Sequence, residues 1–105
     1  MTAPRRAIHF EDKCAHRVER LPGSIWIGSC EPGEQGMLWF YCPCGCGILR
    51  NITVGNRHKP RIGSPSWNWN GSRTEPTLVP SVNCGPVAAC RGWHGWLRDG
   101  YWEAC

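Results

Sequence analysis

Leucine, isoleucine, valine and phenylalanine are scarce in this chain: together they supply 18 of its 105 residues. No stretch approaches the roughly 18 consecutive apolar residues that a membrane-spanning helix needs. Long helices are also disfavoured, because the chain holds 13 glycines and 9 prolines, and both residue types destabilise a helix interior. These features exclude a coiled coil, a helical bundle and a doubly wound nucleotide-binding fold.

Tryptophan and cysteine are abundant instead, with seven and eight residues. Each tryptophan can bury a large apolar area, and so many cysteines in a short chain indicate covalent or metal cross-links. We therefore predict a small, loop-rich, all-β single domain that is stapled by zinc and has a C-terminal hairpin. Residues 1–20 are expected to form a charged, partly extended N-terminal segment, and residues 21–105 the zinc-binding β domain.

Short apolar runs bounded by glycine and proline predict the strands. They lie at residues 24–28, 37–41, 48–54, 67–69 and 77–79. Pro80 places the last of these at a sheet edge, since proline cannot donate to a ladder. Asp99-Gly100 between two apolar arms predicts a tight hairpin. The sequence shows no amphipathic helix.

The N-terminus lacks an apolar core of signal-peptide length, so export by that route is not expected and a cytoplasmic location is predicted. In a reducing compartment, close-spaced cysteines are more often metal ligands than disulfides. Disulfides remain the alternative, because eight cysteines can pair completely.

Three thiols fall within five residues, at Cys42, Cys44 and Cys46. Disulfide geometry disfavours bridges within such a run, whereas thiolates on a glycine-rich turn can converge on one ion. Because one turn usually supplies two of the four zinc ligands, the others must come from elsewhere. Cys90 and His94, separated by three residues, are the best candidates. We predict one zinc per chain, held by Cys90, His94 and two of the three clustered thiols, with the choice of those two left open.

No aspartate or glutamate lies between Glu34 and Glu75. Ten of the twelve basic residues in the chain are arginine, which suits bidentate contacts with phosphate or carboxylate groups. A basic face that only confers solubility is the alternative. We predict a partner-binding surface formed by four of the cationic residues in this interval: Arg57, Lys59, Arg61 and Arg73.

Four segments together resemble a known family: residues 39–47, 67–71, 76–82 and 94–100. It is a family of small phage and bacterial proteins with a domain of unknown function, some of whose members carry the automatic label "ammonia monooxygenase". The resemblance implies a small zinc-binding domain. It also implies a phage origin for some relatives and a place near ubiquitin-like conjugation genes for others. The family's metal positions fall on Cys42, Cys44, Cys46, Cys90 and His94.

The predicted function is a structural-zinc module, phage-encoded in one version, that binds a protein partner or inhibits host machinery in the bacterial cytoplasm. Nucleic-acid binding through residues 50–73 is the alternative, and no membrane partner is expected. A zinc metalloenzyme is the third reading, since His9-x-Glu11 and Pro43-Cys44-Gly45-Cys46 resemble a deaminase motif that is one residue short. A zinc with four protein ligands leaves no open position for water, so the sequence favours a non-enzymatic role without catalytic or cofactor residues.

Overall fold

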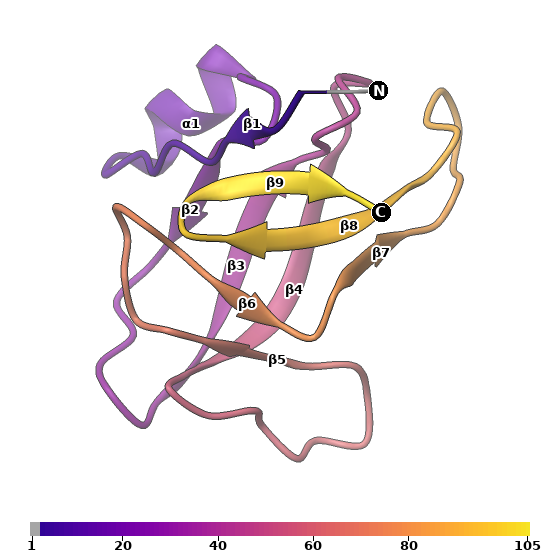
Figure 1. The fold of residues 1–105 in the computed structure, drawn as a ribbon. Coiled ribbons are helices and arrows are strands. Elements are labelled where there is room, and N and C mark those ends of the chain that lie inside the picture. Colours follow the sequence, from indigo (N-terminus) through magenta and orange to yellow (C-terminus); the bar gives the residue numbers. More distant parts are fainter. Residues whose placement is uncertain (1–2) are drawn as a thin grey trace.

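The computed structural model describes residues 3–105, which form two β-sheets and one short helix (Figure 1). The larger sheet has five strands in the order β2-β3-β4-β5-β6. Their bounds are β2 Ile25–Ile27, β3 Gln35–Tyr41, β4 Leu49–Asn56, β5 Trp67–Trp69 and β6 Leu78–Val79. Neighbours pair antiparallel except β4 and β5, which run parallel. The edge position expected of the strand before Pro80 is confirmed by β6.

The smaller sheet has four antiparallel strands in the order β1-β9-β8-β7. They are β1 Arg5–Arg6, β9 Tyr101–Ala104, β8 Trp93–Arg98 and β7 Val82–Cys84. The predicted hairpin joins β8 to β9, where Arg98 pairs with Tyr101 around Asp99 and Gly100. Both turn residues have positive φ, 49° and 85°, as a two-residue hairpin turn of type I′ requires.

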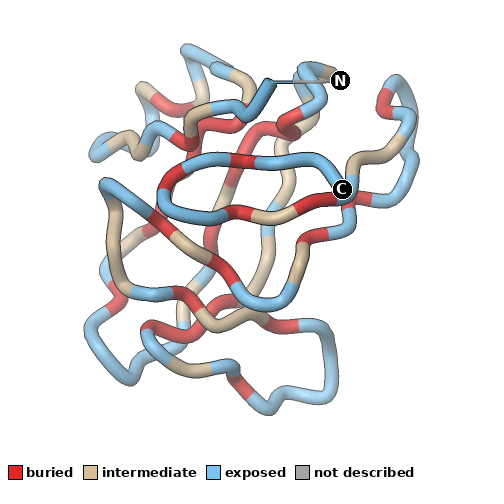
Figure 2. The backbone as a smooth tube through the Cα atoms, in the orientation of Figure 1, coloured by how far each residue is buried: buried red, intermediate tan, exposed pale blue. Residues whose placement is uncertain are grey.

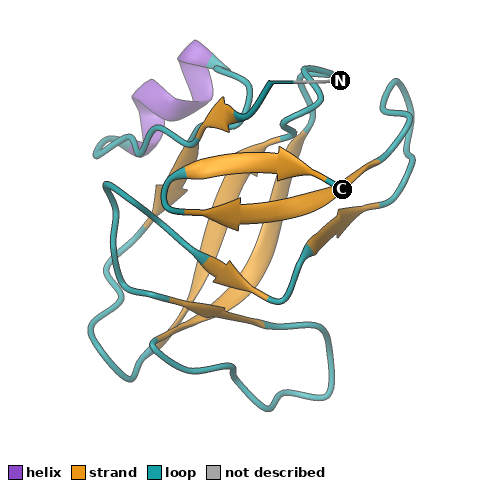
Figure 3. Ribbon diagram, in the orientation of Figure 1, coloured by secondary structure: helices purple, strands orange, loops and turns teal. Residues whose placement is uncertain are grey.

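The core draws on both sheets, since buried residues lie on strands of each, and Figure 2 shows the buried segments in red. Phe40 of the larger sheet packs on Trp102 of the smaller one with ring centroids 5.0 Å apart. Trp93 meets Trp102 edge-on at 5.5 Å, and Trp69 is 1% exposed. Buried tryptophan rings thus add to a core that also holds aliphatic side chains from both sheets, such as Leu38 and Leu97. The all-β prediction is confirmed (Figure 3).

The helix α1, Lys13–Glu19, was not predicted from the sequence. It begins because the Asp12 carboxylate accepts hydrogen bonds from the N–H groups of Cys14 and Ala15, and it ends at Arg20 in the left-handed conformation. Only His16 is buried within it, so the sequence carries no apolar stripe by which to recognise it. No helix in residues 3–105 is long and apolar enough to cross a membrane.

Candidate functional site

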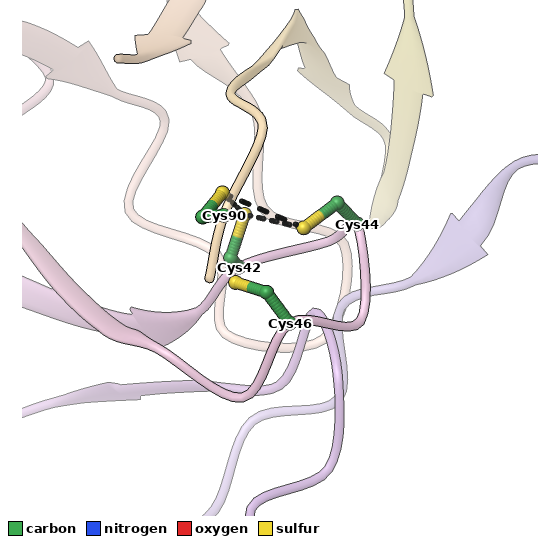
Figure 4. A group of neighbouring side chains, drawn as sticks. All are labelled: Cys42, Cys44, Cys46 and Cys90. Carbon is green, nitrogen blue, oxygen red and sulfur yellow. Dashed lines mark hydrogen bonds between the residues drawn. The ribbon is translucent and has the colours of Figure 1, made fainter. Parts of the chain in front are cut away.

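Four cysteines from two distant parts of the chain come together in one cluster (Figure 4). Cys42 directly follows β3, and Cys44 and Cys46 occupy the turn before β4. The fourth, Cys90, comes from the loop between β7 and β8. The turn closes through the Cys42 N–H, which donates to the Ile48 carbonyl at 3.0 Å. Gly45 and Gly47 have φ of 91° and 83°, a conformation that residues with a Cβ rarely adopt.

The geometry of the sulfur atoms fits a tetrahedral metal site. Cys42 Sγ lies 3.3 Å from Cys44 Sγ and 3.7 Å from Cys90 Sγ. Cys44 Sγ and Cys90 Sγ are 3.6 Å apart, and all four sulfurs lie within 4.8 Å of one another. A tetrahedral zinc with bonds of about 2.3 Å holds its sulfurs about 3.8 Å apart. The cluster can therefore hold one metal ion, and all three cysteines of the turn belong to it.

The Cys90 thiol has a lowered pKa. A hydrogen bond from the Gly92 N–H, the Arg50 guanidinium and the neighbouring thiols lower the pKa of Cys90 to about 6. Burial has the opposite effect on Cys42, whose pKa is well above the ordinary thiol value. Arg50 donates to Cys90 Sγ at 3.2 Å. The lowered pKa favours the thiolate form of Cys90, which is the form that binds metal.

His94, which was expected to complete the metal site, lies outside the cysteine cluster. It is the second residue of β8, and its Nε2 is 3.1 Å from Ser81 Oγ. Ser81 stands between β6 and β7, after a cis Val79–Pro80 peptide bond. The structure thus brings together the four cysteines of the predicted site, and it pairs the predicted histidine with a serine.

The Ser81–His94 pair is accessible to solvent, and backbone contacts position both residues. His94 is exposed and Ser81 half-buried. The Ser81 carbonyl accepts a hydrogen bond from Trp67 Nε1 at 3.1 Å, and β7 pairs with β8 directly after Ser81, with Val82 opposite Gly95. A hydroxyl within hydrogen-bond distance of an imidazole is one part of the arrangement that activates a nucleophile, in which a third group orients the imidazole.

Sequence reasoning missed Ser81, and the signals for it were weak. The residue follows a proline and lacks the Gly-x-Ser-x-Gly context of many serine hydrolases. The one usable signal was the presence of both Ser81 and His94 in the segments that carry the family resemblance.

The predicted basic surface separates into two parts. Arg57, Lys59 and Arg61 are exposed in the loop between β4 and β5. Arg73 is half-buried, where its guanidinium donates to the carbonyls of Ile27 at 2.7 Å and Gly28 at 2.9 Å. These internal bonds give Arg73 a structural role, whereas the three loop residues leave their charges in solvent.

Comparison with known families indicates the class of protein to which this chain belongs. A family model described as "Bacterial ubiquitination-like system serine protease (BubE)" matches residues 10–105. The chain belongs to this family. No curated protein and no solved structure matches it. The BubE description is compatible with the expected neighbourhood of ubiquitin-like conjugation genes and makes protein partners plausible, but it gives no support to a phage origin.

Proposed function

We propose that this BubE-family protein is a serine protease of a bacterial ubiquitination-like system, with Ser81 as nucleophile and His94 as general base. The observation that carries the proposal is the 3.1 Å contact between Ser81 Oγ and His94 Nε2. The family description names the same chemistry. The substrate is then a protein of that system.

The reaction follows the usual course of serine acyl transfer. With the His94 proton on Nδ1, the Ser81 hydroxyl donates to Nε2. Ser81 Oγ forms a bond to the substrate's carbonyl carbon while its proton passes to His94. The C–N bond then breaks, His94 gives that proton to the leaving amine, and an ester remains on Ser81. Water then adds to the ester carbonyl while His94 takes its proton. The bond between Ser81 Oγ and the acyl carbon breaks, His94 returns the proton to Ser81 Oγ, and the carboxylic acid product leaves and ionises to the carboxylate.

We assign a structural zinc to Cys42, Cys44, Cys46 and Cys90. Thiolate ligands in a tetrahedral set favour zinc. When bound, the metal supplies a cross-link between the two sheets, because three ligands flank β3 and β4 and the fourth lies between β7 and β8. That last loop joins the strands that position Ser81 and His94, so the cross-link supports the catalytic pair from one end of its hairpin.

A fluorophosphonate probe tests the nucleophile. Ser81 Oγ bonds to phosphorus, fluoride leaves, and the hydroxyl proton passes to His94. We expect labelling of Ser81 alone, identified by peptide mass spectrometry, with no labelling in Ser81→Ala. His94→Gln should slow labelling by about 10²-fold or more, the usual contribution of a general base. Ser64→Ala, which changes an exposed loop residue, should label at the parent rate. Labelling of another serine, or equal labelling of Ser81→Ala, would refute the proposal.

A further inference from the structure

The strand that follows Ser81 has one open edge. β7 is the terminal strand of the four-stranded sheet, and β8 is its neighbour there. Its residues Val82, Asn83 and Cys84 lie opposite Gly95, His94 and Trp93. The backbone groups on the far side of β7 therefore face away from the sheet, directly after the proposed nucleophile.

The hydrogen bonds of β8 show which residue of β7 directs its backbone N–H and C=O towards the open edge. The Cys105 N–H donates to the His94 carbonyl at 3.0 Å, so the backbone groups of His94 point towards β9. In antiparallel sheets a residue bonded to one neighbour forms a non-hydrogen-bonded pair with the other. Asn83, opposite His94, consequently directs its N–H and C=O towards the open edge of β7.

At Ser81 and Gly85, whose backbone groups point to the same edge as those of Asn83, the carbonyls already have hydrogen-bond partners. The Ser81 carbonyl accepts from Trp67 Nε1, and the Gly85 carbonyl accepts from Arg50 at 2.8 Å. For Asn83 no backbone hydrogen bond of this kind occurs within residues 3–105, and the residue is exposed. The Asn83 N–H and C=O thus lie free between the two carbonyls that Trp67 and Arg50 occupy.

We propose that the open edge of β7 binds the substrate as an added strand, with one substrate residue exchanging both backbone hydrogen bonds with Asn83. The proposal rests on Ser81 being the nucleophile. Asn83 lies two positions after Ser81, a rise of about 7 Å along a strand. The peptide bond to be cleaved therefore lies about two residues from the substrate residue that pairs with Asn83. Main-chain pairing of this kind requires an extended peptide. The substrate segment is therefore a flexible tail or loop rather than a folded surface.

Two boronic acids test the inference: acetyl-tetraalanine boronic acid and acetyl-alanine boronic acid. In both, Ser81 Oγ adds to boron and its proton passes to His94, but only the longer compound reaches Asn83. We expect the longer compound to inhibit fluorophosphonate labelling at a lower concentration. Equal inhibition by both compounds would overturn the inference.

The matched variants are Asn83→Pro, which lacks the N–H, and Asn83→Ala, which keeps it. Proline is tolerated on an edge strand when its N position faces solvent. Loss of one hydrogen bond should weaken the longer inhibitor about threefold to tenfold in Asn83→Pro. The shorter inhibitor, and both inhibitors on Asn83→Ala, should bind as to the parent. Unchanged binding of the longer inhibitor to a folded Asn83→Pro would contradict strand addition.

N-methylated forms of the longer inhibitor provide a second measurement on the parent protein, which does not depend on how Asn83→Pro folds. Because strand pairing uses alternate residues, methylation should weaken inhibition at alternate amides only. The same inhibition by every N-methylated form would overturn the inference. Failure of the fluorophosphonate to label Ser81 in the parent would instead refute the proposed catalytic function.

Discussion

A histidine nitrogen can bind a metal or accept a proton from a hydroxyl, and the neighbours of His94 determine which it does. Its Nε2 contacts Ser81 Oγ at 3.1 Å, while the four clustered sulfurs could hold a metal ion without it. The sequence predicted two thiols from the Cys42–Cys46 run and His94 as a ligand. The structure instead brings all three thiols of the run to Cys90.

Metal content of two variants separates these roles. We expect His94→Gln to retain one zinc per chain, and Cys90→Ser to lose it, because a hydroxyl is a poor substitute for a thiolate ligand. Elemental analysis by mass spectrometry of the purified proteins measures this. A parent without zinc, or loss of zinc from His94→Gln together with retention in Cys90→Ser, would contradict the four-cysteine site.

The candidate site was only partly predictable from single residues. The run from Cys42 to Cys46 stands out because its thiols are close in the sequence, so their convergence needs no knowledge of the fold. The contact between Ser81 and His94 depends on the register of β7 on β8. Pro80 and Gly85 lie near the two ends of β7 and are typical of turns, so the sequence did not indicate a strand there. Neither the register of β7 on β8 nor the contact between Ser81 and His94 could therefore be predicted.

Among the elements, strands with long apolar runs or clear turn signals were predicted. β3 and the β8–β9 hairpin follow from their apolar runs and from Asp99-Gly100. β7 alternates buried and exposed residues, but Pro80 and Gly85 lie close to its two ends, and its position is fixed by pairing with β8. α1 depends on the Asp12 cap and carries no apolar stripe. Local pattern thus missed a short strand between turn residues and a helix that depends on its cap.

The loop at residues 57–66, between β4 and β5, carries exposed basic side chains. It precedes Trp67, whose indole contacts the Ser81 carbonyl, so its exposed charges lie on the chain that leads to the proposed catalytic pair. We infer that Arg57, Lys59 and Arg61 bind an acidic segment of the protein partner. Arginine and lysine in exposed loops suit such recognition.

Changing these three residues together to serine tests the loop. Zinc content and melting temperature should stay nearly unchanged, since exposed substitutions usually have small effects. Binding to a poly-glutamate peptide should weaken at about 50 mM salt and differ less at about 200 mM, because salt screens exposed charges. Arg91→Ser, which removes an exposed charge outside the loop, is the control. If the unsubstituted protein does not bind poly-glutamate but binds single-stranded DNA with a steep salt dependence, the result would favour the nucleic-acid alternative.

At the scale of the whole molecule, the domain has few aliphatic residues with which to hold two sheets together. Its core depends on rings such as those of Phe40, Trp69 and Trp102. The cysteine cluster adds a connection between the β3–β4 turn and the β7–β8 loop. A metal bound there contributes to the free energy of unfolding directly, because the unfolded chain holds no preformed site.

Removal of the metal should therefore unfold the domain. Zinc binding to structural sites is worth about 10–16 kcal/mol, comparable to the whole stability of a typical domain, about 5–15 kcal/mol. We expect a strong chelator to abolish the near-ultraviolet circular dichroism of the tryptophans, and added zinc to restore it. A chelated, zinc-free protein that keeps its native spectrum would show that the sheets hold together without the metal.

The division of the cysteine cluster between two parts of the chain also has a consequence during synthesis. Cys46, the last of the three cysteines in the turn, precedes Cys90 by 44 residues, so the ribosome adds all three well before Cys90. At about 5–20 residues per second, this interval lasts roughly 2–9 seconds. For that time the nascent chain carries three of the four ligands of the proposed metal site. The last ligand lies on the loop between β7, which follows Ser81, and β8, which contains His94. The proposed metal site and the proposed catalytic pair can thus be completed only after all five strands of the larger sheet have been made.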